Sequence, residues 1–399
     1  MKKILIVNNN MKVGGVQKSL LNLLWAISDQ YDITLCLFSE TGDYISQLPK
    51  QVKVYSVCSL FRYLGISQSE CHRLYDKLLR GCLATFCRIL GRPFVIRLML
   101  CSQKQIPEKY DVAISYLQNG NRRSFYGGVN EFVLSKVHAT RKIAYLHCDY
   151  SRCGANFSSN NKLYKQFDCI AACSDGCRHS FLATIPELQE KCITARNFHR
   201  YDEIRRLAAD SPVKYTPNRF HLLVVGRLAH EKAVDRAIRA AAHEIEHGIN
   251  LELHIVGDGM MRDDLRQLAT ELGIQDFVFF HGEQENPYRY MVNADLLLLT
   301  SHHEAAPMVI EEAYALGIPV LSTQTTSSEE MVVARGGGWV CANSQSALNA
   351  TLEKILGNEK ELKAVRSTLR NVSIGNQLAM EQFALLTGDQ YAETANKTG

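Results

Sequence analysis

The chain has few of the features that mark fibrous, low-complexity or membrane-spanning proteins. Among its 399 residues, 25 glycines and 9 prolines are too few for a fibrous or low-complexity sequence. No run of about 18 apolar residues occurs, which excludes a transmembrane helix, and the apolar stretch behind Met1 is too short for a signal peptide. The net charge of +4 is too small to predict nucleic-acid binding. A folded globular protein is expected.

Cysteine is present, but in no arrangement that predicts disulfides or a metal site. The 13 cysteines form an odd number and include no Cys-x-x-Cys motif. Cys169, Cys173 and Cys177 recur at intervals of four, yet the adjacent Asp175-Gly176 predicts a turn rather than a helix. No histidine completes a zinc pattern at the usual spacing. We therefore expect reduced thiols, a cytoplasmic location, no metal and no cofactor.

Two series of short apolar runs alternate with helical segments along the chain. Most runs are continuous, as in strands that are covered on both faces of a parallel sheet. The expected strands are Ile4–Val7, Ile33–Leu37, Val52–Val57, Val112–Ser115, Ile143–Leu146 and Ile170–Ala172, then His221–Val225, Leu251–Val256, Phe277–Phe280, Leu296–Thr300, Pro319–Ser322 and Gly338–Val340. This order predicts two doubly wound α/β domains.

The domain boundary is expected between the two series. Residues 210–218 are polar, contain two prolines and show no periodicity, so they are interpreted as a linker. The first domain then covers residues 1–209 and the second covers residues 219–375. Residues 376–399 follow, with a helical pattern and no further strand.

One segment, residues 61–104, interrupts the alternation. It contains eight basic and two acidic residues, a balance of +6 that leaves −2 for the rest of the chain. Leucines and aromatic residues recur within it at helical spacing. Two interpretations stay open. The segment is either an amphipathic surface that docks on an anionic membrane, or ordinary core with its arginines on a solvated face.

The common phosphate-binding motifs of dehydrogenases and P-loop proteins are missing. Neither Gly-x-Gly-x-x-Gly nor Gly-x4-Gly-Lys-Ser/Thr occurs. Gly14-Gly15 does follow the first expected strand and precede a helix, where backbone amides and the helix N-terminus favour an anion. A plain tight turn is the alternative for this pair.

Two cations follow the first strand of the second series. Arg227 and Lys232 lie beyond its carboxyl end, the edge at which open α/β sheets bind ligands. An arginine fork and a lysine point charge five residues apart suit two phosphates. The alternative is a solvated loop in which Glu231 pairs with a cation.

Two carboxylates flank the start of a later helix. Glu304 precedes the helix expected from about Ala306, and Glu312 lies inside it, about 9 Å further along the axis at ~1.5 Å per residue. This separation suits hydroxyl groups at two places on one extended ligand, with free amides at the helix start for a phosphate between them. The alternative is a set of surface acids that includes Glu311.

These motifs together resemble the family 4 retaining glycosyltransferases, which have the GT-B fold. The resemblance rests on Gly226-Arg227-Leu228 with Lys232, Ile255-Val256-Gly257-Asp258-Gly259, Glu304-x7-Glu312 and Ala313-x3-Gly317-x-Pro319-Val320. Gly14-Gly15 and residues 143–149 agree more loosely. The resemblance implies two Rossmann-like domains that face a cleft. The first would bind the acceptor and the second the nucleotide-sugar, while the last helix crosses back to the first domain.

The resemblance also implies roles for individual residues. Arg227 and Lys232 would clamp the diphosphate without a metal, Glu304 would contact the donor sugar, and His147 would lie near that sugar; these four are the expected catalytic residues. The expected donor-binding residues are Gly14, Gly15, Arg227, Lys232, Gly257, Glu283, Glu304, Met308, Val309 and Glu312. The sequence departs from the family pattern at Ala305-Ala306, where Gly-Phe is frequent, and at Ala233, where glycine is usual.

The expected function is hexosyl transfer with retention, from a nucleotide-sugar to a glycan acceptor on a lipid carrier, in bacterial surface polysaccharide synthesis. UDP is the expected donor nucleotide, with GDP and ADP left open. Two alternatives remain: a UDP-sugar epimerase of the same fold, and a non-catalytic nucleotide-sugar-binding subunit. If residues 61–104 dock on lipid, the protein is peripheral on the inner face of the cell membrane.

Overall fold

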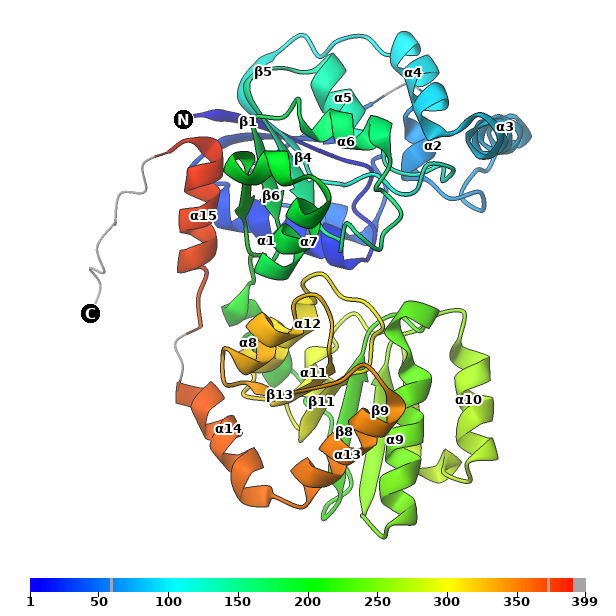
Figure 1. Ribbon diagram of the computed structural model, residues 1–399, viewed down its shortest axis with the longest axis vertical. Coiled ribbons are helices and arrows are strands. Elements are labelled where there is room, and N and C mark those ends of the chain that lie inside the picture. The colour runs from blue at the N-terminus through cyan, green and yellow to red at the C-terminus, as the bar shows by residue number, and fades with distance from the viewer. Residues whose placement is uncertain (58–59, 372–373, 390–399) are drawn as a thin grey trace. The chain divides into compact units, whose positions relative to one another are not determined.

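The computed structural model describes residues 1–57, 60–371 and 374–389, and the chain divides into two compact units (Figure 1). The first unit contains Met1–Phe198 together with Asn376–Gly399, and the second contains His199–Gly375. Each is built around a parallel sheet, as the alternating pattern predicts. Within the described ranges, no helix is long and apolar enough to cross a membrane.

The sheet of the first unit has seven strands in the order β3-β2-β1-β4-β5-β6-β7. In the central strand β1, Ile4 pairs with Ile33 on one side and with Val112 on the other. The strands are β1 (Lys3–Asn8), β2 (Asp32–Leu37), β3 (Lys53–Ser56), β4 (Lys109–Ser115), β5 (His138–Leu146), β6 (Cys169–Ala172) and β7 (Cys192–Thr194). The sequence interpretation missed β7, because three residues are too few to show a pattern.

Eight α-helices of the first unit lie within the described residues. They are α1 (Gly15–Ile27), α2 (Arg62–Gly65), α3 (Leu74–Leu90), α4 (Arg92–Ser102), α5 (Val129–Lys136), α6 (Ser158–Tyr164), α7 (Asp175–Thr184) and α15 (Gln377–Thr387). The turn expected at Asp175-Gly176 is wrong, because both residues lie in the first turn of α7. The hydroxyl of Ser174 caps this helix by accepting a hydrogen bond from the amide of Cys177 at 3.1 Å. A good N-cap therefore outweighs the turn propensity of Asp-Gly.

The last described helix, α15, packs on the first unit. Phe383 and Leu386 join its core, and the ring of Phe383 meets Tyr31 edge-on at 5.8 Å. The amide of Arg196 donates to the side chain of Gln382 at 2.9 Å. The chain therefore contributes to the first unit at both of its ends. Residues from 390 onward, which belong to the expected tail 376–399, lie outside the described residues.

The sheet of the second unit has six strands in the order β10-β9-β8-β11-β12-β13. The strands are β8 (Phe220–Val225), β9 (Leu251–Val256), β10 (Val278–Gly282), β11 (Leu296–Leu299), β12 (Val320–Thr323) and β13 (Gly338–Cys341). The helices are α8 (Tyr201–Ala209), α9 (Val234–Glu246), α10 (Arg262–Glu271), α11 (Tyr288–Met291), α12 (Met308–Ala315), α13 (Gln345–Leu356) and α14 (Glu359–Asn371). All six strands correspond to expected runs.

The boundary expected at residue 209 lies 11 residues beyond the division after Phe198. Helix α8 belongs to the second unit, because Ile204 and Ala208 are buried in its core. The expected linker 210–218 also packs on this unit: the amide of Val213 donates to the Arg289 carbonyl at 2.9 Å, and the Tyr215 hydroxyl donates to the Tyr290 carbonyl at 2.6 Å. The polar composition of this segment reflects its hydrogen bonds to α11. Sequence alone does not distinguish such a packed segment from a free linker.

The unusual segment 61–104 folds into α2, α3 and α4 at the outer side of the first unit (Figure 1). Helix α3 packs against α4, and of its apolar side chains Leu83 and Cys87 are buried. Six other apolar side chains of α3 are exposed: Leu74, Tyr75, Leu78, Phe86, Ile89 and Leu90. The interpretation of this helix as ordinary core is therefore wrong for most of its apolar residues.

Candidate active site

A short polar contact joins two of the expected site residues, Lys232 and Glu304, in the second unit. The ammonium of Lys232 lies 2.5 Å from Glu304 Oε1, and the hydroxyl of Ser301 donates to the same oxygen at 2.7 Å. The side chain of Glu304 is 11% exposed and that of Lys232 is 29% exposed. One carboxylate is thus oriented by two donors, while its surface stays partly accessible.

The fold brings these two residues together across β8 and β11, neighbours in the sheet. Lys232 ends a short 3₁₀ turn beyond β8, and Glu304 follows β11. The hydroxyl of Thr300 donates to the carbonyls of Lys232, at 3.1 Å, and Ala233, at 2.9 Å. The amide of His302 donates to the Glu231 carbonyl at 2.9 Å. Both loops are therefore fixed to each other by their backbones.

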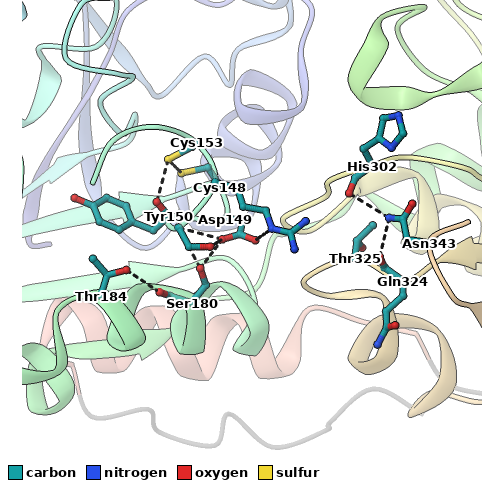
Figure 2. A network of polar contacts seen from close by, with 12 residues as sticks. Cys148, Asp149, Tyr150, Cys153, Ser180, Thr184, His302, Gln324, Thr325 and Asn343 are labelled. Atoms are coloured by element: carbon teal, nitrogen blue, oxygen red, sulfur yellow. Dashed lines mark hydrogen bonds and ion pairs between the residues drawn. The ribbon is translucent and has the colours of Figure 1, made fainter. Parts of the chain in front are cut away.

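A third strand-end loop supports the loop that carries Glu304. The side-chain amide of Asn343 donates to the carbonyls of His302 at 3.2 Å and Gln324 at 3.0 Å, as Figure 2 shows. Sequence reasoning missed Asn343 as well as Thr300 and Ser301. The last two lie directly before Glu304 in the sequence, whereas nothing local marks Asn343 as their partner.

Arg227 does not share the Lys232–Glu304 contact. Its guanidinium donates to Glu231 Oε1 at 2.7 Å, and its side chain is 72% exposed. The solvated pair that sequence left open for Glu231 is therefore present. An exposed pair four residues apart stabilises little, so Arg227 can exchange Glu231 for another anion.

The glycines of the second unit allow close backbone approach between strand ends. Gly257 has φ +138°, and a Cβ there would lie 1.9 Å from the Gly226 carbonyl oxygen. Its amide donates to the carbonyl of Gly282 at 2.7 Å. Any side chain at this position would clash with the backbone of Gly226. Packing therefore explains the glycine at 257 independently of its expected role in binding the nucleotide-sugar. Glu283 follows Gly282 and is exposed.

Helix α12 starts at the expected place and contains two buried acids. Met308 and Val309 form its first turn. Glu312 is buried within the helix at 3% exposure. Glu311, one of the possible surface acids, is also buried: it forms an ion pair with Arg335 and accepts a hydrogen bond from the Tyr201 hydroxyl at 3.1 Å. Its role is therefore to join α12 to α8.

In the first unit, Gly14 and Gly15 form the start of α1. Gly14 is the residue before the helix, and a Cβ on it would lie 2.8 Å from the side-chain oxygen of Gln17. The side chains of Asn9 and Asn10 are buried here, and the side-chain Nε2 of Gln17 lies 3.5 Å from Asn9 Oδ1 and 3.4 Å from Asn10 Oδ1. Sequence reasoning assigned no role to these asparagines.

His147 directly follows β5, stacked among aromatic rings. Its ring centroid lies 4.7 Å from that of Tyr116 and 5.6 Å from that of Tyr145. The Nε2 atom is buried and has no hydrogen-bond partner among the residues that the structure describes. Burial lowers the pKa of His147 to about 3, so the ring is neutral near pH 7 and has an unused polar atom.

The loop behind His147 is held by a polar network (Figure 2). Asp149 accepts hydrogen bonds from the hydroxyls of Ser151, at 2.7 Å, and Ser180, from α7. The sulfur atoms of Cys148 and Cys153 lie 3.1 Å apart across the same turn. These contacts anchor the loop to α7 and fix the backbone that carries His147.

The sequence of the second unit is similar to that of known proteins. Residues 210–372 match the family model of glycosyl transferases group 1. The lipopolysaccharide glucosyltransferase WaaG of Escherichia coli (strain K12) is 36% identical over 140 residues, covering 34% of this chain and 37% of the relative. A GDP-mannose-dependent alpha-(1-6)-phosphatidylinositol dimannoside mannosyltransferase of Mycobacterium tuberculosis (strain ATCC 25177 / H37Ra) is 30% identical over 159 residues, covering 40% and 41%. Such matches span about two fifths of these relatives.

The whole chain is similar in fold to solved structures. Anabaena HepE, in complex with UDP and glucose, is 19% identical, with a TM-score of 0.66 over 97% of this chain and 98% of HepE. The crystal structure of WaaG, a glycosyltransferase involved in lipopolysaccharide biosynthesis, is 18% identical, with a TM-score of 0.59 over 96% and 100%. The GT-B fold is confirmed. The resemblance to glycosyltransferases is confirmed over residues 210–372, which match the group 1 family model.

Proposed function

Because residues 210–372 match the group 1 glycosyl transferases, we propose that this chain transfers a hexose from a UDP-sugar to a glycan on a lipid carrier, with retention of anomeric configuration, in surface polysaccharide synthesis. The observation that carries the proposal is the Lys232–Glu304–Ser301 contact at the carboxyl end of the sheet, inside the matched region. HepE was solved with UDP, and WaaG and the dimannoside mannosyltransferase are named for lipid-linked glycans.

In this proposal the two cations bind the donor diphosphate. The bond from the anomeric carbon to the phosphate oxygen breaks, and negative charge develops on the leaving diphosphate. Lys232 and Arg227 stabilise that charge, which requires no metal. The acceptor oxygen bonds to the anomeric carbon from the same face, and its proton passes to the leaving phosphate. Met308 and Val309, in the first turn of α12, add backbone amides to the phosphate site.

The carboxylates bind hydroxyl groups. Glu304 is held through Oε1 by Lys232 and Ser301, and a carboxylate has further acceptor positions on its second oxygen for donor-sugar hydroxyls. Glu312 accepts from the ribose, and Gly257 and Glu283 border the nucleotide. His147 supports the proposal through its neutral ring and the unused Nε2 atom, which would hydrogen-bond a sugar hydroxyl.

Nucleoside diphosphate release, measured with and without acceptor, tests this function. Transfer requires release of UDP that depends on the acceptor, together with a product of increased mass whose new linkage has the anomeric configuration of the donor. Release with water alone would indicate the epimerase alternative. Binding of UDP without release under any acceptor would indicate the non-catalytic subunit.

Membrane docking through α3 and α4 is the second part of the proposal. At about 100° per residue, the exposed apolar residues of α3 occupy one continuous arc. The exposed basic residues Arg73, Lys77 and Arg88 lie together along one border of it. Exposed Phe94 and Leu98 extend the apolar surface onto α4. A basic border beside an apolar face suits a surface of anionic lipid, and a lipid-linked acceptor would be presented there.

Only some of the basic residues within 61–104 are suited to test this docking. Arg92 is fully buried, and Arg80 donates to the Ile66 carbonyl at 2.9 Å, so neither offers a free charge to lipid. We expect flotation with phosphatidylglycerol vesicles that is lost when Arg73, Lys77 and Arg88 are changed to glutamate. The charge-matched control changes Arg239, Lys354 and Lys360 to glutamate in the second unit. Equal losses in both variants, or binding to phosphatidylcholine alone, would contradict the docking surface.

A further inference from the structure

Three side chains with metal-binding atoms gather on one face of the second unit's sheet. They are His221 on β8 and Glu252 and His254 on β9. Parallel pairing places His221 beside Glu252, and the alternation of strand side chains places His254 on the same face two residues later. Their side chains are only 4–8% exposed. Buried imidazole and carboxylate groups of this kind require a defined partner.

The mutual distances of the three candidate ligand atoms are nearly equal. His221 Nδ1 lies 3.4 Å from His254 Nε2, and Glu252 Oε2 lies 3.5 Å from each of these nitrogens. In a tetrahedral zinc site with bonds of about 2.1 Å, neighbouring ligand atoms are about 3.4 Å apart. The three atoms therefore form one face of a tetrahedron of the size that zinc requires.

Each ligand is also oriented from behind. His221 Nε2 lies 2.9 Å from the Thr216 carbonyl, which can only accept, so this nitrogen carries the proton and Nδ1 presents its lone pair inward. Glu252 Oε1 lies 3.3 Å from the guanidinium of Arg219. His254 Nδ1 lies 3.2 Å from His281 Nε2. Such outer contacts of metal ligands fix tautomer and ring orientation.

A single proton satisfies this cluster poorly. The inward lone pair of His221 and the carboxylate oxygen of Glu252 are both acceptors, and a hydrogen on His254 Nε2 can be directed at only one of them. A divalent cation bonds to all three at once. The geometry points to a zinc site formed by His221, Glu252 and His254, with a water molecule as the fourth ligand. Two imidazoles and one carboxylate are a typical zinc ligand set.

The site is separate from the Lys232–Glu304 contact and has a structural role. His221 is the second residue of β8, whereas Lys232 lies beyond the carboxyl end of that strand. The ring of Tyr215 stacks on His254 at a centroid distance of 4.0 Å and on His221 at 4.7 Å. Zinc would therefore tie β8 to β9 and hold the segment that precedes β8. Sequence analysis predicted no metal. The three ligands lie up to 33 residues apart and match no short metal-binding motif.

The test uses the full chain, stripped with a chelator and then titrated with Co²⁺ and Zn²⁺. We expect one equivalent of Co²⁺ with the visible absorption of tetrahedral coordination, displacement by Zn²⁺, and a higher melting temperature with zinc. Glu252→Gln and His254→Gln should each weaken zinc at least about 100-fold. His243→Gln is the matched control, because His243 and His247 form a surface pair with rings 4.4 Å apart that could bind zinc adventitiously.

Three results would overturn the inference. They are a stripped wild-type chain that binds no Co²⁺, ligand variants that bind zinc normally, and binding that disappears in the His243→Gln control. Circular dichroism and UDP titration of the variants separate metal loss from unfolding. If a ligand variant fails to fold, the wild-type Co²⁺ spectrum and its zinc-dependent melting temperature still decide the matter.

Discussion

Each unit contains a glutamate held by a cation, and the two pairs differ in what surrounds the cation. In the first unit, Arg92 Nη1 lies 2.8 Å from Glu131 Oε1, and the arginine side chain is 0% exposed. In the second unit, Lys232 lies 2.5 Å from Glu304, and the lysine side chain is 29% exposed. Both glutamate side chains are 11% exposed. Similar contacts therefore occur in a closed and in an accessible environment.

Access to the cation, more than the contact itself, distinguishes these two pairs. A ligand can reach Lys232, whereas Arg92 is enclosed by protein and its positive charge is balanced by Glu131. Breaking the buried pair leaves an uncompensated charge inside the unit. When the accessible pair is broken, water can solvate the ammonium of Lys232, so the free energy of unfolding should change little.

Glu131→Ala should have the largest effect on stability. We expect the free energy of unfolding of the first unit to fall by about 3–5 kcal/mol, because Arg92 would be left buried without a partner. Denaturant unfolding measures the change. Glu108→Ala is the control, because Glu108 pairs with Lys3 at 2.7 Å with both side chains about half exposed, and it should unfold like the wild type. Equal stability of both variants would remove the distinction between the two kinds of pair.

Glu304→Gln should have the complementary effect, on activity alone. The amide keeps the hydrogen bond from Ser301 but loses the charge that orients Lys232. We expect kcat to fall about 100- to 1000-fold with unchanged thermal unfolding. Transfer kinetics and calorimetry measure the two quantities. The exposed Glu271→Gln on α10 is the control and should keep normal turnover. Near-normal turnover of Glu304→Gln would exclude Glu304 from the site.

Alanine substitutions of Arg227 and Lys232 test how the two cations of the second unit differ. Each of Arg227→Ala and Lys232→Ala should weaken UDP binding by about 1.5–3 kcal/mol, the range for hydrogen bonds to charged groups. The Lys232→Ala substitution should weaken UDP binding more than Arg227→Ala does, because Lys232 is less exposed than Arg227. The double variant should lose less than the sum, since both act on one diphosphate. Calorimetric titration with UDP measures this; unchanged affinity in both single variants would contradict the diphosphate clamp.

Ala233→Gly should have the smallest effect, and in the favourable direction. Ala233 follows Lys232 and has φ +46° and ψ +47°, a left-handed conformation that alanine adopts at a cost. Glycine there should raise the free energy of unfolding of the second unit by about 0.5–1 kcal/mol. Ala242→Gly, in the regular part of α9, is the control and should lower it by about 1 kcal/mol. Destabilisation at both positions would show that strain at Ala233 is negligible.

Most strand positions were predictable because the central strands of both sheets are buried on both faces. Such strands read as continuous apolar runs, and every expected run corresponds to a strand. The loops at their carboxyl ends were predictable for the same reason, and this is where Lys232 and Glu304 lie. Helix α7 and the residues 199–218 were assigned wrongly, because an N-cap and contacts with α11 outweighed local turn and linker composition.

The two parallel sheets and the strand-end loops that carry Lys232 and Glu304 follow from the sequence, because apolar periodicity is a local property. Tertiary structure alone decided which side chains meet. Asn343 supports the Glu304 loop, Glu311 pairs with Arg335, and His221 meets His254. These partners come from strands or helices far apart in the chain. Their pairing depends on sheet order and register, which no short stretch of sequence contains.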